Sequence, residues 1–181
     1  MSSEELHELH EHAEHAKHNP SLAPVSLTMA VLAVLVAIVS LLGHRAATEA
    51  VLNQSKASDQ WAYFQAKNIR GHEDKLFTDL TAVASASDPE ALARVREGYI
   101  AEAEKYKDDQ KEIESEARKL EQEVALEQRK ANRFDLGEVF LEIALVITSI
   151  TLLSGKRVFW LFGLCFGTVG IVVAATGLLV R

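Results

Sequence analysis

The 181-residue sequence contains a single cysteine and only three prolines. One thiol, Cys165, excludes both an intramolecular disulfide framework and a metal site built from a cysteine cluster. After Pro24 the only further proline is Pro89, so long helices can run between them without interruption. The sequence also lacks a glycine-rich phosphate loop, a Ser–His–Asp arrangement and Cys–His metal spacing. These absences give catalysis almost no support, and we expect a protein that is not an enzyme.

Basic residues are absent from three long segments, 25–43, 136–154 and 158–180, which together contain only two acids. Residues 44–133, in contrast, carry 15 Lys and Arg and 18 Asp and Glu. This segregation argues against an ordinary globular domain, in which apolar residues are spread through amphipathic elements. A net charge of −7 and a pI of about 5.5 argue against nucleic acid as a partner.

Each of the three segments has the length of a transmembrane helix, which needs roughly 20 apolar residues. Residues 25–43 are uncharged and follow Pro24. A signal peptide is the competing interpretation, but residues 1–24 are acidic and no small-residue cleavage pattern follows. Aromatic rings crowd the start of 158–180, as is typical of a membrane–water boundary. The sequence therefore predicts a protein with three spans, surrounded by membrane lipid.

Residues 136–154 contain the two intramembrane acids, Glu138 and Glu142, one helical turn apart. Glu142 lies about 9 Å inside the start of the segment at ~1.5 Å per residue. An ionisable residue in a span indicates a cation or proton site by default. The alternative is that Glu138 reaches the interface and that Glu142 pairs with His44, Arg45 or a partner subunit. We favour this alternative because Glu142 is not at the bilayer centre.

Three crossings place the acidic tail, residues 1–24, and the Lys156-Arg157 turn on one side of the membrane. Residues 44–133 lie on the other side together with Arg181. More Lys and Arg flank the spans on the side of residues 44–133. Because Lys and Arg near span ends favour the cytoplasm, we expect this segment to be cytoplasmic.

Residues 44–133 contain one clear turn signal, near residues 85–89, with the sequence Ser-Ala-Ser-Asp-Pro. Ser87 or Asp88 can cap a following helix, and Pro89 suits its first turn. Ser87 and Glu90 have the spacing of a capping box. The segment is therefore predicted to be an extramembrane helical hairpin.

The second hairpin helix shows an unbroken 4-3 spacing that is typical of a coiled-coil seam. Within the hairpin two positions, Gln110 and Glu127, are polar, which can set register at some cost in stability. The seam extends into the second span. Its members are Tyr99, Ala103, Tyr106, Gln110, Ile113, Ala117, Leu120, Val124, Glu127, Ala131, Phe134, Glu138, Leu141, Leu145, Thr148 and Leu152.

The first hairpin helix shows a weaker row with the same spacing, which extends backwards into the first span. All its intramembrane members are small, and small residues let helices approach closely in lipid. We infer that each hairpin helix is continuous with its neighbouring span. The row comprises Ser26, Ala30, Ala33, Ala37, Ser40, His44, Ala47, Val51, Gln54, Ser58, Trp61, Gln65, Asn68 and His72.

The third span carries a row of small residues at the same spacing, which predicts a close helix contact. The contact is either with the first two spans or with another subunit, and the two can coexist. A long two-helix rod buries little area per residue, so we expect a homo-oligomer or a subunit of a larger complex. The small residues of the row are Gly163, Gly167, Gly170, Ala174 and Gly177.

The N-terminal tail alternates histidines with glutamates, and both are ligands for divalent transition metals such as zinc, nickel or copper. We favour a solvated acidic tail without a cofactor, because His-rich tracts bind metal weakly. Titration of the imidazoles near pH 6.5 makes a pH response a further hypothesis. The five histidines are His7, His10, His12, His15 and His18.

The run from Pro24 to Lys67, in which a span passes directly into a polar helix carrying Gln60-Trp61-Ala62-Tyr63, resembles an uncharacterised bacterial family. Its members are small multi-pass inner-membrane proteins that share a domain of unknown function. The similarity covers nearly the whole chain, including the Ser-Asp-Pro-Glu-Ala-Leu turn and the two terminal spans. The resemblance implies a location in the bacterial inner membrane. It implies no functional residue, because the family has no established activity.

Three functional hypotheses follow from these patterns. The first is a non-enzymatic membrane scaffold or accessory subunit that associates through the hairpin and the small-residue faces. The second is an oligomeric cation or proton channel, or a transporter component, that uses Glu138 and Glu142. The third is metal or pH sensing by the histidine-rich tail.

Overall fold

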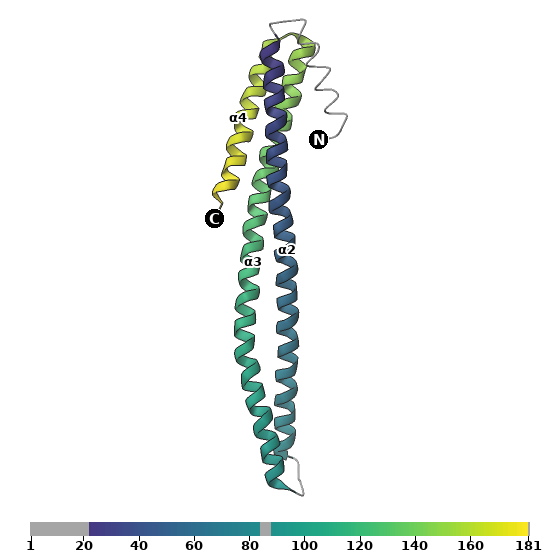
Figure 1. Cartoon of the computed structure of the whole chain (residues 1–181), viewed down its shortest axis with the longest axis vertical. Helices are drawn as coiled ribbons and strands as arrows, with labels where there is room; N and C mark the ends of the chain where they lie inside the picture. Colours follow the sequence, from purple (N-terminus) through teal and green to yellow (C-terminus); the bar gives the residue numbers. More distant parts are fainter. Residues whose placement is uncertain (1–21, 84–87, 181) are drawn as a thin grey trace. The chain divides into compact units, whose positions relative to one another are not determined.

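The computed structural model describes residues 22–83 and 88–180, whose regular structure is entirely helical. Its helices are α2 (Ala23–Val83), α3 (Pro89–Ser154) and α4 (Arg157–Leu179). They pack as antiparallel hairpins, α2 against α3 and α3 against α4 (Figure 1). The predicted all-α class with three long helices is therefore confirmed.

Helix α2 is continuous from Ala23 to Val83 and so contains the first apolar segment and the first hairpin helix. Its proline, Pro24, lies in the first turn, where a missing N–H group costs no helical hydrogen bond. Helix α3 likewise joins the second hairpin helix to the second apolar segment. The expectation that neither helix ends where polar sequence meets apolar sequence is confirmed.

Helix α3 begins with the cap that the turn sequence predicts. The side-chain Oδ1 of Asp88 accepts hydrogen bonds from the backbone N–H groups of Glu90 and Ala91, at 3.1 and 3.0 Å. Pro89 occupies the first helical position, where its fixed φ suits the helix. Ser87, the alternative cap, lies outside the described residues.

A two-residue link joins α3 to α4. Gly155 adopts a φ of +67°, which glycine reaches without the steric cost of a Cβ atom. Its N–H donates to the carbonyl of Thr151 at 2.9 Å and so satisfies one of the last carbonyls of α3. The tight turn expected at residues 154–157 is confirmed, and α4 ends at Leu179, one residue before the end of the predicted span.

The described residues form two units, and α2 and α3 contribute to both. The first, here called the apolar unit, contains residues 22–50 and 126–180. The second, the polar unit, is Val51–Ala125. The apolar unit has a core of buried side chains from all three helices, namely Leu32, Val39, Phe134, Leu141, Ala144 and Ala174.

All three helices contain a stretch that is long and apolar enough to cross a membrane. Only 28, 28 and 22% of these stretches, in α2, α3 and α4, are buried inside the chain. The remaining residues of these stretches are half-buried or exposed. Much apolar surface therefore faces outwards, which is unfavourable in water at about 25 cal/mol per Å² of apolar surface. Such outward-facing apolar helices suggest a membrane protein.

The seam predicted for α3 coincides with the face that α3 buries. In the polar unit, Ile113 and Ala117 are buried and the other predicted positions from Tyr99 to Val124 are half-buried. In the apolar unit, the predicted positions from Glu127 to Leu152 are likewise buried or half-buried. The spacing of apolar residues therefore locates the packing face of α3 correctly in both units.

The packing face of α2 differs from the predicted row by one residue, which is a rotation of about 100°. Ala33 is buried, but Ala30 and Ala37 are exposed. In the apolar unit, larger apolar residues occupy this face. Because residues 25–43 are almost uniformly hydrophobic, their periodicity does not show which side of the helix is buried. The face observed comprises Val25, Met29, Leu32, Val36, Val39, Gly43, Ala46, Ala50, Asn53, Ala57, Gln60, Phe64, Lys67, Gly71, Asp74, Thr78 and Thr81.

Candidate functional site

The row of small residues on α4 packs against α3 within the chain. All five residues of the row are buried. A Cβ atom added to Gly163 would collide with the side-chain oxygen of Thr148, and one added to Gly177 would lie 3.1 Å from the ring of Phe134. Of the two contacts left open by the sequence, the intramolecular one is therefore present.

Helices α3 and α4 also approach closely at Gly137 of α3 and Gly170 of α4. A Cβ atom on Gly170 would lie 3.0 Å from the carbonyl oxygen of Gly137, and one on Gly137 would lie 2.8 Å from the Cβ of Ala174. Because the obstructing atoms belong to backbone or to a short side chain, they cannot move aside cheaply. Gly137 belongs to the same contact as the α4 row, but it was not predicted because it is isolated in its own helix.

The two acids in the apolar part of α3 occupy different environments. Glu138 is half-buried at the edge of the packing face, whereas Glu142 is exposed on the outer side of the helix. Glu142 therefore points away from the other helices of the chain. In a membrane-spanning helix, a carboxylate in this position faces either lipid, where it is costly, or a neighbouring molecule.

A hydrogen bond connects α4 to α2 near the start of both helices. Trp160 donates its indole N–H to the hydroxyl oxygen of Thr28 at 3.2 Å, and that hydroxyl donates to the carbonyl of Pro24 at 2.8 Å. An indole with one polar partner and an apolar ring is suited to a membrane–water boundary.

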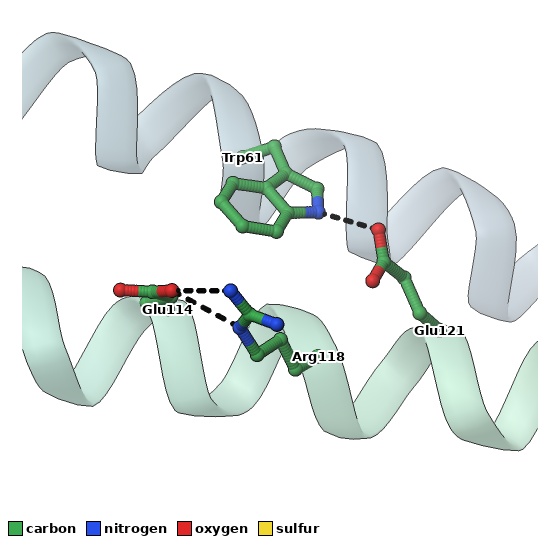
Figure 2. Close-up of polar contacts among 4 residues, drawn as sticks. All are labelled: Trp61, Glu114, Arg118 and Glu121. Atoms are coloured by element: carbon green, nitrogen blue, oxygen red, sulfur yellow. Dashed lines mark hydrogen bonds and ion pairs between the residues drawn. The ribbon is translucent and has the colours of Figure 1, made fainter.

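The polar unit is held together by side chains that reach across from α2 to α3. Gln60 donates to the carboxylate of Glu116 at 2.8 Å. The next residue, Trp61, donates its indole N–H to Glu121, also at 2.8 Å (Figure 2). The ring of Trp61 also meets that of Phe64 edge to face at 5.5 Å. These bonds fix the relative register of the two helices in this unit.

An ion pair lies at the centre of this polar contact. Lys67 Nζ is 2.8 Å from Asp109 Oδ2, and the lysine side chain is only 16% exposed. The same ammonium lies 4.7 Å from the ring centroid of Tyr106 and 5.6 Å from that of Tyr63. The hydrogen bond raises the pKa of Lys67 and lowers the pKa of Asp109. Both groups are therefore charged over the physiological range.

A second acid on the packing face of α2 is poorly accommodated. Asp74 Oδ2 is buried and accepts no hydrogen bond from the residues that the structure describes. Burial raises the pKa of Asp74, and the nearby carboxylates of Glu102 and Glu73 raise it further. The carboxylate is thus less favourable in the folded hairpin than in water.

Beside these residues an open groove of about 460 Å³ lies between α2 and α3. Charged side chains of both signs line it, including Lys75, Lys107 and Glu104, together with His72. This mixture does not select a ligand of one charge. The aromatic pair Phe77 and Tyr99 stacks at 5.3 Å further towards the turn.

The five histidines of the tail lie outside the described residues, so metal binding there stays a prediction. Within residues 22–83 and 88–180, no group of three or more His, Cys, Asp or Glu side chains is placed to hold a metal ion. Cys165 is a free, exposed thiol on α4.

Comparison with known proteins places the chain in a family. Residues 21–180 match the family described as a domain of unknown function (DUF4337), and the chain belongs to this family. No curated protein and no solved structure gives a significant match. The resemblance drawn from the sequence agrees with this family in its unknown function.

Proposed function

We propose that this protein is a non-enzymatic scaffold or accessory subunit of the bacterial inner membrane. Residues 25–43, 136–154 and 158–180 cross the bilayer, and the hairpin of residues 44–133 extends into the cytoplasm. The hairpin and the outer faces of the spans bind further copies of the chain or partner proteins.

The observation that carries this proposal is the low burial of the three apolar stretches, of which no more than 28% is inside the chain. A bilayer covers such surfaces at no hydrophobic cost. Within the chain, α3 and α4 already pack closely through their glycine contacts. The rest of their apolar surface is therefore available to lipid and to other subunits.

The polar unit supports the second half of the proposal. Its helices associate through an ion pair and hydrogen bonds between long side chains, which suits a hairpin surrounded by water. It contains a groove of mixed charge and exposed apolar side chains on α2. This composition favours protein–protein contact over chemistry on a small substrate.

The test is cross-linking in native membranes followed by mass spectrometry, with carbonate extraction of the same membranes. We expect the full chain to resist extraction and to form cross-links from hairpin lysines such as Lys107 and Lys119 to other copies or to partner proteins. Extraction at alkaline pH as a soluble protein would contradict the membrane location. A monodisperse monomer in mild detergent that cross-links to nothing would contradict the scaffold role.

A second candidate function is a cation or proton path in an oligomer. The position of Glu142 favours it, because this carboxylate is exposed on the outer side of an apolar helix, where a neighbouring subunit can face it. If this function is correct, Glu142→Gln lowers cation or proton flux into liposomes, whereas the exposed, extramembrane control Glu112→Gln leaves it unchanged. Equal flux in wild type and Glu142→Gln would exclude this function.

A further inference from the structure

Helix α2 carries a second row of apolar side chains in the polar unit, on the side opposite α3. The row is displaced by two residues, or about 200°, from the face that packs on α3. All seven positions are exposed, and the four largest apolar side chains are between 52 and 82% exposed. Its spacing is 4-3 throughout and covers three seven-residue repeats. The positions are Ala62, Ala66, Ile69, Glu73, Leu76, Leu80 and Val83.

The equivalent row on α3 provides an internal comparison. It is displaced by the same two residues from the packing face of α3 and is also exposed. Apart from one alanine its members are polar, as expected of a helix side that faces water. They are Ala101, Lys105, Asp108, Glu112, Ser115, Lys119 and Gln122. The two helices of one hairpin therefore have outer sides of opposite character.

We propose that the outer row of α2 is a parallel dimer interface, in which it packs against the same row of a second copy of this chain. A 4-3 apolar row is complementary to itself, because each side chain fits between four residues of an identical helix. The inference relies on the proposed function, since copies inserted in one bilayer with one orientation present their α2 helices parallel and at equal heights. Identical positions then meet across a two-fold axis.

The charges of the two helices favour pairing through α2 over pairing through α3. Residues 62–83 contain three basic and three acidic side chains, so two copies of this stretch do not repel each other. Residues 89–125 of α3 contain seven basic and eleven acidic side chains. Two copies of α3 would therefore bring like net charges together.

One acid interrupts the row, at Glu73. In a parallel pair it meets Glu73 of the second copy, and His72 and Arg70 flank it on both helices. The guanidinium of Arg70 partly offsets the repulsion between the two carboxylates. A single polar position of this kind lowers stability but penalises any shifted alignment, so it sets the register of the pair.

The size of the row explains why the pairing needs the membrane. At ~1.5 Å per residue and a helix diameter of about 10 Å, the row offers on the order of 300 Å² per copy. Stable complexes in solution bury about 800 Å² per partner. Confinement of both copies to one bilayer raises their effective concentration and compensates for the small area. The N-terminal tail is not the occupant, because three crossings place it on the other side of the membrane.

The test uses disulfide formation in the full-length chain in native membranes. The native thiol is removed by Cys165→Ala, and single cysteines are introduced by Leu76→Cys, by Leu80→Cys or, as the matched control on α3, by Ser115→Cys. Disulfides require Cβ atoms about 4 Å apart, which a two-fold axis at the α2 row provides. We expect mild oxidation to give at least about fivefold more disulfide-linked dimer at Leu76 and Leu80 than at Ser115.

Any of four results would overturn the inference. Equal dimer formation at all three positions would indicate random collision, and more dimer at Ser115 would place the contact on α3. Linkage of the Leu76→Cys thiol to a different protein would mean that the row binds a partner of another sequence. Carbonate extraction of the same membranes distinguishes the two proposals: a membrane-integral chain without dimers contradicts only the pairing, and an extractable chain contradicts the proposed function.

A second set of variants tests the interface without a thiol at its centre. With Leu80→Cys as the reporter, Ile69→Lys combined with Leu76→Lys places two lysines per copy on the row. We expect about tenfold less dimer, because like charges would meet across the axis. The matched control, Glu112→Lys with Ser115→Lys on α3, leaves the dimer unchanged. Circular dichroism of each purified variant confirms that the helices are retained, and undiminished dimer in the row variant contradicts the proposal.

Discussion

The apolar and polar units are built from the same two helices, α2 and α3, but they are held together by different means. In the apolar unit, α3 and α4 approach until the backbone of one limits the side chain of the other, as at Gly137 and Gly170. In the polar unit, α2 and α3 are connected by long side chains that form an ion pair and hydrogen bonds, as between Lys67 and Asp109.

The difference fits the surroundings that the proposed function gives to each unit, lipid for the apolar unit and water for the polar unit. In lipid, apolar side chains gain nothing by leaving the solvent, so helices associate through close van der Waals contact that small residues permit. In water, burial of apolar surface is favourable. Polar side chains that pair between the helices then fix how α2 and α3 are aligned. The two units should therefore respond to different substitutions.

The largest effect is expected at the glycine contact of the apolar unit. Gly137→Ala would place a Cβ atom 2.8 Å from the Cβ of Ala174 and 2.9 Å from its backbone nitrogen, so α3 and α4 must separate. We expect a loss of about 2–3 kcal/mol in the free energy of unfolding, measured by thermal unfolding of the full chain in detergent. The control is Gly98→Ala in the polar unit, where nothing lies within 4 Å of the added atom. Equal stability of Gly137→Ala and wild type would contradict close packing.

The next effect is expected at the ion pair of the polar unit. Lys67→Met removes the hydrogen bond to Asp109 and leaves that carboxylate at the interhelical contact. We expect backbone amides near residues 67 and 109 to exchange hydrogen about three to five times faster, measured by mass spectrometry on the full chain. The control is Arg118→Met, because Arg118 pairs with Glu114 of its own helix at 2.7 Å and does not connect the helices (Figure 2). Equal acceleration in both variants would show that the interhelical pair has no special role.

The same pair predicts a dependence on pH at both extremes. The lowered pKa of Asp109 means that its contribution is complete above the ordinary aspartate pKa and is lost as the pH falls through the lowered value. The raised pKa of Lys67 means that its contribution is complete below the ordinary lysine pKa and is lost as the pH rises through the raised value. Protection of these amides should therefore be constant near neutrality and should fall in acid and in strong base. A change centred near neutral pH would contradict this assignment.

An effect of opposite sign and smaller size is expected at Asp74. Because the folded hairpin raises the pKa of this carboxyl, its contribution is favourable below the ordinary aspartate pKa and is lost as the pH rises. At pH 7, Asp74→Asn should therefore slow exchange of nearby amides by about twofold. Asp79→Asn, at an exposed position on the same helix, is the control. Faster exchange in Asp74→Asn would mean that the charged carboxylate has a partner.

The sequence predicted the packing face of α3 better than that of α2. The reason is that apolar and charged residues are more clearly separated by position along α3. Along α3, apolar residues such as Ile113 and Leu120 alternate with charged ones, so only one face can be buried. The packing face of α2 includes Lys67 and Asp74, which resemble surface residues in the sequence. Lys67 is half-buried because it pairs with Asp109 of α3, whereas the Oδ2 of Asp74 is buried with no hydrogen bond from the residues that the structure describes. Pairs between distant segments are invisible to the periodicity of a single helix, and the phase of α2 was therefore missed by one residue.

The candidate sites likewise contain some residues that the sequence predicts and others that only the structure locates. The α4 row was predicted because five small residues repeat on one face, whereas Gly137, which opposes it, has no repeat around it. The positions of Glu138 and Glu142 relative to the other helices required the structure, since a one-turn spacing does not say which carboxylate faces outwards. The outer row of α2 became recognisable only after the inner face had been assigned.

The smallest effect is expected where a polar contact of the polar unit is backed by an apolar one. Trp61→Phe removes the N–H that donates to Glu121 (Figure 2). It keeps an aromatic ring beside Phe64. Because both partners of the hydrogen bond are reachable by water, which can replace the lost donor, we expect amide exchange near residue 61 to change by less than about twofold. Trp61→Ala, which removes the ring as well, should have the larger effect. If Trp61→Phe matched Trp61→Ala, the hydrogen bond rather than apolar contact would hold this part of the hairpin, and the contrast between the two units would be sharper than we infer.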